Sequence, residues 1–527
     1  MTNPISDIEK ADVILVAGSN TTETHPVIAA AVKRAVKFGG TKLIVADPRR
    51  IELKKHAHLS LSPAPGSDLA WINGMIRVIL EEGLEDAAYI EKRTEGIDAL
   101  REAVAPYTPE HVEELTGIPA EQLVQAALVY AGMEKGSILY CMGITQHTTG
   151  TDNVKALANL AMVCGNVGIE GGGVNPLRGQ NNVQGACDMG GLPDVYPGYR
   201  KVHDEAHALA MEKAWGVTGL SRTPGLTATE MVDEAIKGSL KALYVIGENP
   251  LVSEADLNHA EKAFHNLDFL VVQDIFMTET AQAADVVLPA LCFAEKDGTF
   301  TNTERRVQRV RKAVDGPEGV PSDWEVTCEI ARRMGADMSY PSAEDIFDEL
   351  ASVTPAFTGL NYGRLDGEGI PWPCPTADHP GTPRLHVERF ARGKGIFFPV
   401  TFTPAAETPD ADYPLVLTTG RVLYHYHTGT MTRKSGGLNQ QVSECFVEMS
   451  REDALERNLA HGEIALIFSR RGKIKARVNL SDRMEKGTVF LPFHFAEAAA
   501  NRLTNAALDP DSKIPEFKVC AVTVVKA

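Results

Sequence analysis

The sequence contains no run of about 18 apolar residues, the length that a transmembrane helix needs. A transmembrane segment is therefore not expected. Residues 1–12, MTNPISDIEKAD, lack the charged start and apolar core of a signal peptide. A cytoplasmic location is taken only as the default expectation. Basic residues are scarce, because 52 lysines and arginines stand against 70 aspartates and glutamates, a formal net charge of −18. Nucleic-acid binding needs a basic surface and is not expected either.

Cysteine is sparse and scattered, and no C-x-x-C pair occurs among the eight cysteines, at positions 141, 164, 187, 292, 328, 374, 445 and 520. This spacing is typical of reduced, packed thiols, and it favours neither a disulfide framework nor a zinc or iron–sulfur site. No metal site is predicted from the residues of this chain.

The G-x-G-x-x-G fingerprint of dinucleotide-binding proteins is also missing, although the chain opens as a β-α-β unit. A strand is predicted at Val13–Ala17, a helix from about Pro26 to Lys37 and a second strand at Lys42–Val45. An ordinary NAD site is therefore not expected. In parallel sheets, ligands bind at the carboxyl ends of the strands, where Asn20 and Asp47 lie. Asp47 could accept a ribose hydroxyl, or it could cap the turn before Pro48.

Polar residues close further predicted strands in both halves of an α/β chain. Gly143 and Gln146 follow a strand at Ile138–Met142, and Gly247 and Glu248 follow one at Ala242–Ile246. Gln273 and Asp274 follow a strand at Phe269–Val272. If these ends converge on one crevice, they form a large, elongated ligand site.

The remaining regions differ in composition. Residues 296–312 are basic and predict a solvated face, or a contact with a partner domain or an acidic cofactor. A proline- and glycine-rich connection follows from Leu360 to Pro414, and then strands of period two, such as Lys473–Leu480, predict a β-barrel. The expected segments are two α/β domains at 1–182 and 183–295, a connecting region at 296–410 and a barrel at 411–527.

The most informative stretch is Val174–Gly191, VNPLRGQNNVQGACDMGG, which is rich in glycine, asparagine and glutamine. Such a segment can place backbone N–H groups and amide side chains against a polar ligand, because glycine permits close approach. Arg178 is its only cation, and a guanidinium suits a carboxylate or phosphate held by two contacts. We interpret this stretch as a ligand loop; the alternative is a structural turn.

These motifs resemble a known family. The stretches NPLRGQNNVQGACDMG, VVQDIFMTETAQAADVVLP, DGTFTNTERRVQ, WPCPTADHPGTPRL and TGRVLYHYHTGTMT are similar to a formate dehydrogenase large (alpha) subunit. That subunit belongs to the molybdopterin oxidoreductase superfamily, which includes dimethyl-sulfoxide reductase. The resemblance implies two Rossmann-like α/β domains around a cofactor crevice, capped by the C-terminal barrel. It also implies a bis(molybdopterin guanine dinucleotide) cofactor with molybdenum or tungsten.

The resemblance assigns roles residue by residue. Arg178 matches the arginine that orients formate. The residues matched to one guanine dinucleotide are Asn20, Asp47 and Gly66, and those matched to the pterins are Met142, Gly143, Gln146, Gly179 and Gln180. The residues matched to the second nucleotide or the pterins are Gly247, Glu248, Gln273, Asp274, Arg421, His425 and Lys518. From the residues alone, His425 and His427 could also be metal ligands or hydrogen-bonding groups.

Two family features are absent from this sequence. The family begins with a cysteine cluster that holds a [4Fe–4S] centre, followed by a selenocysteine or cysteine that ligates the metal. We therefore expect a truncated reading frame, in which a selenocysteine codon was read as a stop, and no formate oxidation by this chain alone. A partner subunit with iron–sulfur centres or flavin would carry the electrons away.

Two other functions remain open at this point. The chain could be another oxidoreductase of the superfamily, such as a nitrate reductase or a formylmethanofuran dehydrogenase. It could also be a non-catalytic scaffold subunit that has kept the fold and lost the metal. The RGQNNVQG loop speaks against the first alternative, and the retained Arg178 speaks against the second.

Overall fold

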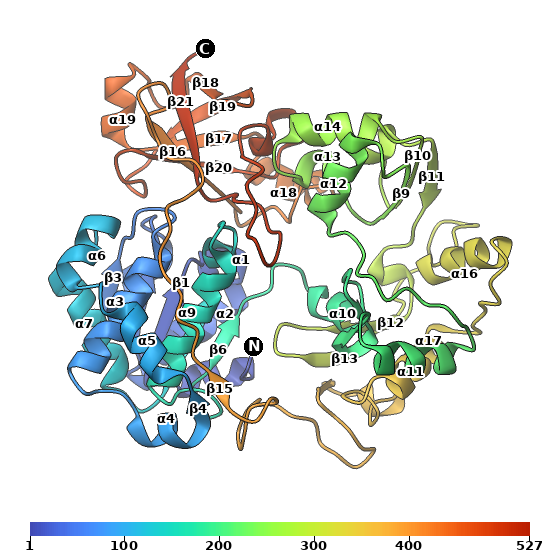
Figure 1. Cartoon of the computed structure of the whole chain (residues 1–527). Helices are drawn as coiled ribbons and strands as arrows, with labels where there is room; N and C mark the ends of the chain where they lie inside the picture. The colour runs from blue at the N-terminus through green and yellow to red at the C-terminus, as the bar shows by residue number, and fades with distance from the viewer. The chain divides into compact units, whose positions relative to one another are not determined.

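The computed structural model describes residues 1–527 and divides into two compact units (Figure 1). Unit 1 comprises Met1–Leu177, Pro250–Lys262 and Arg384–Ala527, and unit 2 comprises Arg178–Asn249 and Ala263–Pro383. Parallel sheets and a closed C-terminal barrel confirm the predicted fold class. None of the helices is long and apolar enough to span a membrane. The four segments expected from the sequence stay a prediction.

Unit 1 contains a five-stranded parallel sheet of order β3-β2-β1-β5-β6. Its strands are β1 (Val13–Ala17), β2 (Lys42–Ala46), β3 (Leu59–Leu61), β5 (Gly136–Tyr140) and β6 (Val174–Pro176). All residues of β1 and β5 are buried, as a parallel sheet covered on both faces requires. The chain leaves β1 toward β2 on one side and returns to β5 on the other, so β1 and β5 flank a topological switch point.

Helices cover this sheet because their apolar residues recur at helical spacing. In α3 the residues Leu69, Ile72, Met75, Ile76 and Ile79 form a buried stripe. The helices of this region are α1 (Thr21–Thr24), α2 (Pro26–Gly39), α3 (Asp68–Glu81), α4 (Ala87–Arg93), α5 (Ile97–Val104), α6 (Pro109–Thr116), α7 (Ala120–Ala131), α8 (Met142–Thr145) and α9 (Gly150–Val163).

Two helices of this region begin in different ways. Thr108 caps α6, and its hydroxyl accepts a hydrogen bond from the His111 N–H at 3.1 Å. Ser67 precedes α3, but its hydroxyl donates to the Ala64 carbonyl at 2.7 Å and caps nothing. The preceding turn, and not the helix, uses this hydroxyl.

The C-terminal part of unit 1 is a closed barrel of order β16-β20-β17-β19-β18-β21. Its strands are β16 (Leu415–Gly420), β17 (Phe446–Met449), β18 (Ile464–Phe468), β19 (Lys473–Leu480), β20 (Thr488–Pro492) and β21 (Cys520–Lys526), with α18 (Gly436–Gln441) and α19 (Arg451–Glu456) between them. Strands β18 and β19 pair antiparallel. Along β19, Ile474, Ala476 and Val478 are buried and alternate with exposed lysine and arginine side chains.

Ion pairs join the barrel to the parallel sheet. The guanidinium of Arg49, which follows β2, pairs with Glu448 of β17 at 2.5 Å, and both side chains are buried. The same guanidinium lies 3.6 Å from the ring centre of Phe490, a cation–π contact. Arg483 donates to Glu23 at 2.8 Å. These contacts fix the position of the barrel against the edge of the sheet.

Unit 2 contains a three-stranded parallel sheet of order β11-β10-β9 and a smaller antiparallel sheet of order β12-β13-β14. These strands are β9 (Ala242–Ile246), β10 (Phe269–Asp274), β11 (Val286–Pro289), β12 (Gly298–Thr301), β13 (Arg306–Val310) and β14 (Ile370–Pro371). The helices are α10 (Val183–Asp188), α11 (Glu205–Trp215), α12 (Ala228–Lys237), α15 (Glu279–Gln282), α16 (Asp323–Arg333) and α17 (Ala343–Val353). Helix α13 (Pro250–Ser253) and most of α14 (Leu257–His265) belong to unit 1.

One expected strand has other bounds, and two further segments contain regular structure that was not predicted. The strand expected at Ile138–Met142 is β5 (Gly136–Tyr140), and Met142 instead begins α8. The basic stretch 296–312 is not only a solvated face, because it forms the β12–β13 hairpin and buries Arg305 between Glu304 and Arg306. The loop Val174–Gly191 contains regular structure, namely β6 and α10.

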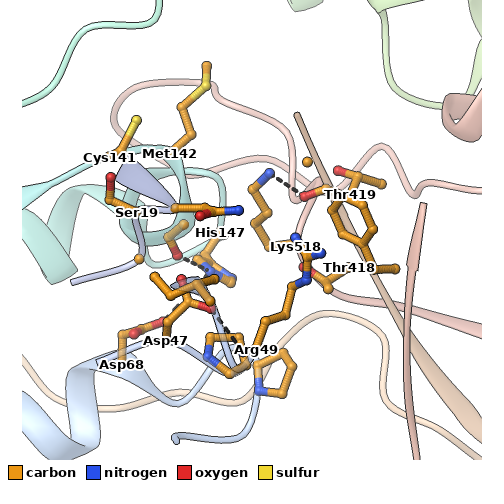
Figure 2. Close-up of a pocket in the computed structure, with 18 of the residues that line it drawn as sticks. Ser19, Asp47, Arg49, Asp68, Cys141, Met142, His147, Thr418, Thr419 and Lys518 are labelled. Carbon is orange, nitrogen blue, oxygen red and sulfur yellow. Dashed lines mark hydrogen bonds and ion pairs between the residues drawn. The ribbon is translucent and has the colours of Figure 1, made fainter. Parts of the chain in front are cut away.

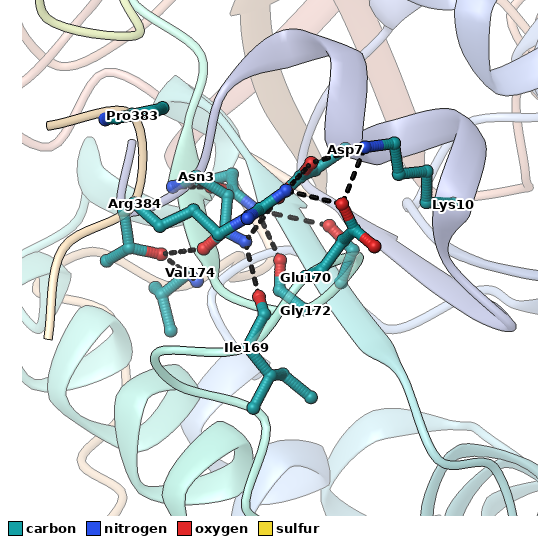
Figure 3. Close-up of polar contacts among 12 residues, drawn as sticks. Asn3, Asp7, Lys10, Ile169, Glu170, Gly172, Val174, Pro383 and Arg384 are labelled. Atoms are coloured by element: carbon teal, nitrogen blue, oxygen red, sulfur yellow. Dashed lines mark hydrogen bonds and ion pairs between the residues drawn. The ribbon is translucent and has the colours of Figure 1, made fainter. Parts of the chain in front are cut away.

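A buried network ties the first residues of the chain to the returning connection (Figure 3). Arg384 donates to both carboxylate oxygens of Asp7, at 2.6 and 2.9 Å, and to Glu170 at 2.6 Å. Asn3 also donates to Asp7, at 3.0 Å. Burial alone would raise the pKa of Asp7, but the hydrogen bonds from Arg384 and Asn3 lower the pKa below its ordinary 3.8. The ionised carboxylate is therefore the stabilised form.

An Asp7→Asn substitution is expected to lower the free energy of unfolding by about 2 kcal/mol at pH 7, because Arg384 loses its bidentate partner. The folded-state pKa of Asp7 lies below the unfolded one, so its contribution is present above pH 3.8 and is lost as the pH falls through the folded value. Urea unfolding at several pH values measures both effects. Asp98→Asn, whose side chain is 91% exposed, is the control, and an equal loss of stability in both variants would contradict the prediction.

Candidate functional site

A pocket in unit 1 lies where the carboxyl ends of the parallel strands face the barrel (Figure 2). The residues that line this pocket come from both the sheet and the barrel. From the sheet side it is lined by Gly18, Ser19, Asn20, Thr24, Asp47, Pro48, Arg49, Ile51, Pro63, Ala64, Pro65, Gly66, Asp68, Cys141, Met142, Gly143 and His147. From the barrel it is lined by Thr418, Thr419, Gly420, Arg421, Phe490, Phe493 and Lys518.

Two glycines form the floor of the pocket at the switch point. The Gly143 N–H donates to the Gly18 carbonyl at 3.0 Å. A Cβ atom at Gly143 would lie 2.5 Å from that carbonyl oxygen, and one at Gly18 would lie 2.7 Å from the Gly143 carbonyl carbon. Gly18 also has φ of +54°, which side chains rarely permit. Only glycine at both positions lets the ends of β1 and β5 meet this closely.

Positive charge on one side of the pocket comes from Arg49, Arg421 and Lys518. The Lys518 side chain is buried and donates to the Thr419 carbonyl at 2.7 Å. Burial lowers the pKa of Lys518 to about 8, and burial also lowers the pKa of Arg421. Buried cations that contact few carboxylates are suited to an anionic ligand such as a phosphate, which would restore the solvation that the protein removes.

Acidic groups occupy the opposite side of the pocket. Asp47 accepts a hydrogen bond from the Arg49 N–H at 2.8 Å, and Asp68 accepts one from the Trp71 indole at 3.1 Å. Burial raises the pKa of both carboxyls, that of Asp68 to about 7. These groups can accept hydrogen bonds from sugar hydroxyls or from the amino groups of a base.

His147 connects the floor to this acidic side. One ring nitrogen, Nε2, lies 2.9 Å from the Gly143 carbonyl and 3.7 Å from Asp68. Burial lowers the pKa of His147 to about 4, so the ring is neutral near pH 7 and its Nε2–H donates to Gly143. The contact with Asp68 is therefore not an ion pair at neutral pH.

The pocket brings together seven of the predicted cofactor residues, namely Asn20, Asp47, Gly66, Met142, Gly143, Arg421 and Lys518. Gln146 follows α8 and lies outside the lining. His425 also lies outside it, because its ring contacts the Thr432 hydroxyl at 3.2 Å and the Val442 carbonyl at 2.6 Å. Their roles in cofactor binding stay predictions.

Sequence reasoning missed several polar residues of the pocket, namely Ser19, Arg49, Asp68, His147, Thr418 and Thr419. For Ser19, Arg49, Thr418 and Thr419 a signal existed, because each lies at or just beyond the end of a strand. No local pattern marks Asp68 or His147, which reach the pocket through the packing of α3 and the turn after α8.

The predicted ligand loop enters unit 2 at Arg178, and its unit 2 part is held by the β12–β13 hairpin. The Arg178 N–H donates to the Thr303 hydroxyl at 3.2 Å, and Asn182 accepts from the Thr301 N–H at 2.8 Å. The Arg178 guanidinium donates to Gln184 at 3.3 Å. Gly179 and Gln180 follow Arg178 directly, and both are half-exposed.

The other predicted residues of unit 2 gather at the carboxyl edge of its parallel sheet. The Gly247 N–H donates to the Gln273 carbonyl at 2.9 Å. Gln273 and Asp274 were expected to follow the strand, but they are the last two residues of β10. Burial raises the pKa of Glu248. No group of three or more histidines, cysteines or acidic residues in the described chain is arranged to hold a metal ion.

Two family models match this chain. Residues 1–333 match the family "Molybdopterin oxidoreductase", and residues 415–521 match "Molydopterin dinucleotide binding domain". The second match covers most of the barrel, and the first covers the strands whose ends line the pocket.

Curated relatives are similar along nearly the whole chain. F420-dependent formate dehydrogenase subunit alpha of Methanocaldococcus jannaschii is 52% identical over 99% of this chain and 78% of that relative. Formate dehydrogenase H of Escherichia coli is 41% identical over 99% of this chain and 74% of that relative. Among solved structures, acetylene hydratase from Pelobacter acetylenicus has a TM-score of 0.76 at 20% identity, covering 99% of this chain and 81% of that one. At this identity the last likeness concerns the fold alone.

A Lys518→Met substitution is expected to stabilise the cofactor-free chain by up to about 3 kcal/mol near pH 7, because it removes a buried charge. The folded-state pKa of about 8 lies below the ordinary 10.5, so the cost of the charge is fully present below pH 8. The gain should fade as the pH rises from 8 to 10.5. Thermal unfolding across this pH range measures it.

The same substitution should reduce the amount of bound pterin in the purified protein, measured by fluorescence after oxidation. Lys475→Met, at an exposed position of β19, is the control. Equal melting behaviour and equal pterin content in Lys518→Met and the parent chain would refute the assignment of Lys518 to an anion.

Proposed function

Since this chain belongs to the molybdopterin oxidoreductase family, we propose that it is the catalytic subunit of a formate dehydrogenase. In the proposed reaction, formate gives CO₂, one proton and two electrons. The observation that carries this proposal is the Arg178 loop, whose only cation lies among glycine and amide residues. The names of the relatives support the same substrate.

The molybdopterin cofactor is proposed to be bis(molybdopterin guanine dinucleotide), with molybdenum or tungsten as the metal. When bound, this group accepts the two electrons that formate releases. The pocket of unit 1 fits one nucleotide arm, because Arg49, Arg421 and Lys518 can contact phosphates. Asp47 and Asn20 can contact the sugar and the base. Gly247, Glu248, Gln273 and Asp274 would hold part of the second arm.

Arg178 is proposed to hold the carboxylate of formate. Formate is the smallest carboxylate and offers no other group for recognition, so a two-point contact with a guanidinium supplies both binding and alignment. The amide of Gln184 fixes one edge of the guanidinium, at 3.3 Å. Gly179 and Gln180, next in the chain, leave the backbone able to approach a ligand closely.

Arg178→Ala in the intact holoenzyme is expected to lower kcat/KM for formate by about 30-fold to 1,000-fold, equivalent to about 2–4 kcal/mol for a lost charge-assisted pair. Arg178→Lys keeps the charge but loses the planar fork, so an intermediate loss is expected. Steady-state kinetics with a dye acceptor measures both variants.

Arg311→Ala is the matched control, because this arginine lies in the same unit and is 51% exposed. An unchanged formate dependence in Arg178→Ala would remove Arg178 from the substrate site. Turnover of nitrate and not of formate by the holoenzyme would reject the proposed substrate altogether.

The electron acceptor is proposed to be coenzyme F420, reached through a partner subunit with iron–sulfur centres or flavin. This proposal rests on the relatives, which are named F420-dependent and are alpha subunits of larger enzymes. The complex purified with its partner should reduce F420 with formate, and the loss of F420 absorbance measures this rate. The same complex should reduce NAD⁺ at least about tenfold more slowly. Formate oxidation with a dye but not with F420 would contradict this acceptor.

A further inference from the structure

Unit 2 contains a buried acidic residue near Arg178 that has no role in the reaction as proposed above. Asp188, at the end of α10, is 1% exposed and accepts three hydrogen bonds. Gln184 and the Tyr199 hydroxyl both donate to Oδ1 at 2.8 Å, and the Trp372 indole donates to Oδ2 at 2.8 Å. Gln184 belongs to the same helix as Asp188, whereas Tyr199 lies 11 and Trp372 lies 184 positions further along the chain. The carboxylate therefore joins α10 to two segments outside this helix.

The hydrogen bonds around Asp188 determine which way the Gln184 amide faces. Its Nε2 donates to Asp188 at 2.8 Å and to the Tyr199 oxygen at 2.9 Å, which uses both amide hydrogens. Its Oε1 is then left to accept from the Arg178 guanidinium at 3.3 Å. A flipped amide would place its oxygen against the carboxylate and its hydrogens against the guanidinium, and both contacts are repulsive.

The charge of Asp188 also acts on Arg178 directly. The guanidinium of Arg178 favours the ionised carboxylate, as do the three hydrogen bonds, whereas burial raises the pKa of Asp188 to about 6. Arg305 is a second cation near this carboxylate, and its guanidinium donates to the Thr382 and Pro383 carbonyls at 3.1 and 2.9 Å. Asp188 is therefore mostly ionised at neutral pH and offsets part of the positive charge of this region.

We propose that Asp188 and Gln184 form a positioning relay that sets the direction of the Arg178 guanidinium toward formate. The relay rests on the proposed function, in which Arg178 holds the substrate. Asp188 orients the amide of Gln184, and the amide oxygen fixes one edge of Arg178. This contact sets the direction in which the guanidinium meets the carboxylate of formate. Neither Asp188 nor Gln184 touches the substrate in this scheme, so both are positioning residues.

The relay predicts a specific kinetic pattern in the intact holoenzyme complex. Asp188→Asn keeps the shape but cannot accept all three donors, so the Gln184 amide loses its fixed orientation. Gln184→Met keeps the length but removes the amide. Each variant is expected to raise the KM for formate about tenfold or more, with a smaller change in kcat, because the guanidinium is displaced and not removed. Rates are normalised to pterin content.

Non-additivity distinguishes a relay from two separate effects. The double variant Asp188→Asn/Gln184→Met should have a KM close to that of either single variant, because both substitutions break the same chain of contacts. Asp188→Asn added to Arg178→Ala should not raise the KM further. Asp366→Asn is the control, because this aspartate is in the same unit, is 63% exposed and pairs with Arg311.

The possible results separate the relay from the proposed function. Lower thermal stability with an unchanged KM in Asp188→Asn and Gln184→Met would overturn the relay and leave Asp188 a structural residue. If Arg178→Ala also leaves the KM unchanged, the role of Arg178 fails instead. Where Asp188→Asn does not fold, Tyr199→Phe removes one donor from the same carboxylate, and an unchanged KM in both Tyr199→Phe and Gln184→Met would equally overturn the relay.

Discussion

The close approach of Gly18 and Gly143 is the constraint on which the pocket of unit 1 depends. At this point β1 and β5 lie side by side, but their connections run to opposite sides of the sheet. The chain segments that follow the two strand ends therefore run in different directions and leave room for a ligand, as in other open α/β sheets. A side chain at either glycine would push the strands apart or fill the floor. Backbone geometry, and not side-chain chemistry, makes the space.

The barrel adds two positive charges to that of Arg49 on the sheet side of the pocket. Arg421 and Lys518 come from the barrel side, while Asp47 and Asp68 come from the sheet side. The Arg49–Glu448 pair and the Arg483–Glu23 pair hold the barrel in place and keep these charges opposed. A ligand that carries a sugar and a base next to phosphates suits such a pocket.

In unit 2, too, contacts between buried polar groups hold charged side chains in place. A buried carboxylate, Asp188, is satisfied by three donors, and one of these, Gln184, also accepts a hydrogen bond from Arg178. Buried polar groups of this kind need every partner in place, so they fix side-chain directions more strictly than apolar packing does. A substrate as small as formate requires such strictness, because few contacts are available to align it.

Local pattern was enough to predict most elements. The buried run of β1, the alternation in β19 and the apolar stripe of α3 follow from periods of two and 3.6 residues, which neighbours along the chain define. Asn20, Asp47 and Gly143 could be proposed as site residues because each follows a strand. The resemblance in the Arg178 loop then pointed to the family.

Other features depend on residues that are far apart in the chain, and only the folded structure brings these together. Asp188 is hydrogen-bonded to Trp372, which is 184 positions away in the sequence, and Arg49 is hydrogen-bonded to Glu448, which is 399 positions away. Ser67 did not cap its helix because a nearby turn took its hydroxyl, and Arg305 is buried although it lies in a basic stretch. The hydrophobic period and the composition of a segment reflect its interactions with residues that are close in the sequence. Which charges become buried, and beside which partners, depends on the path of the whole chain.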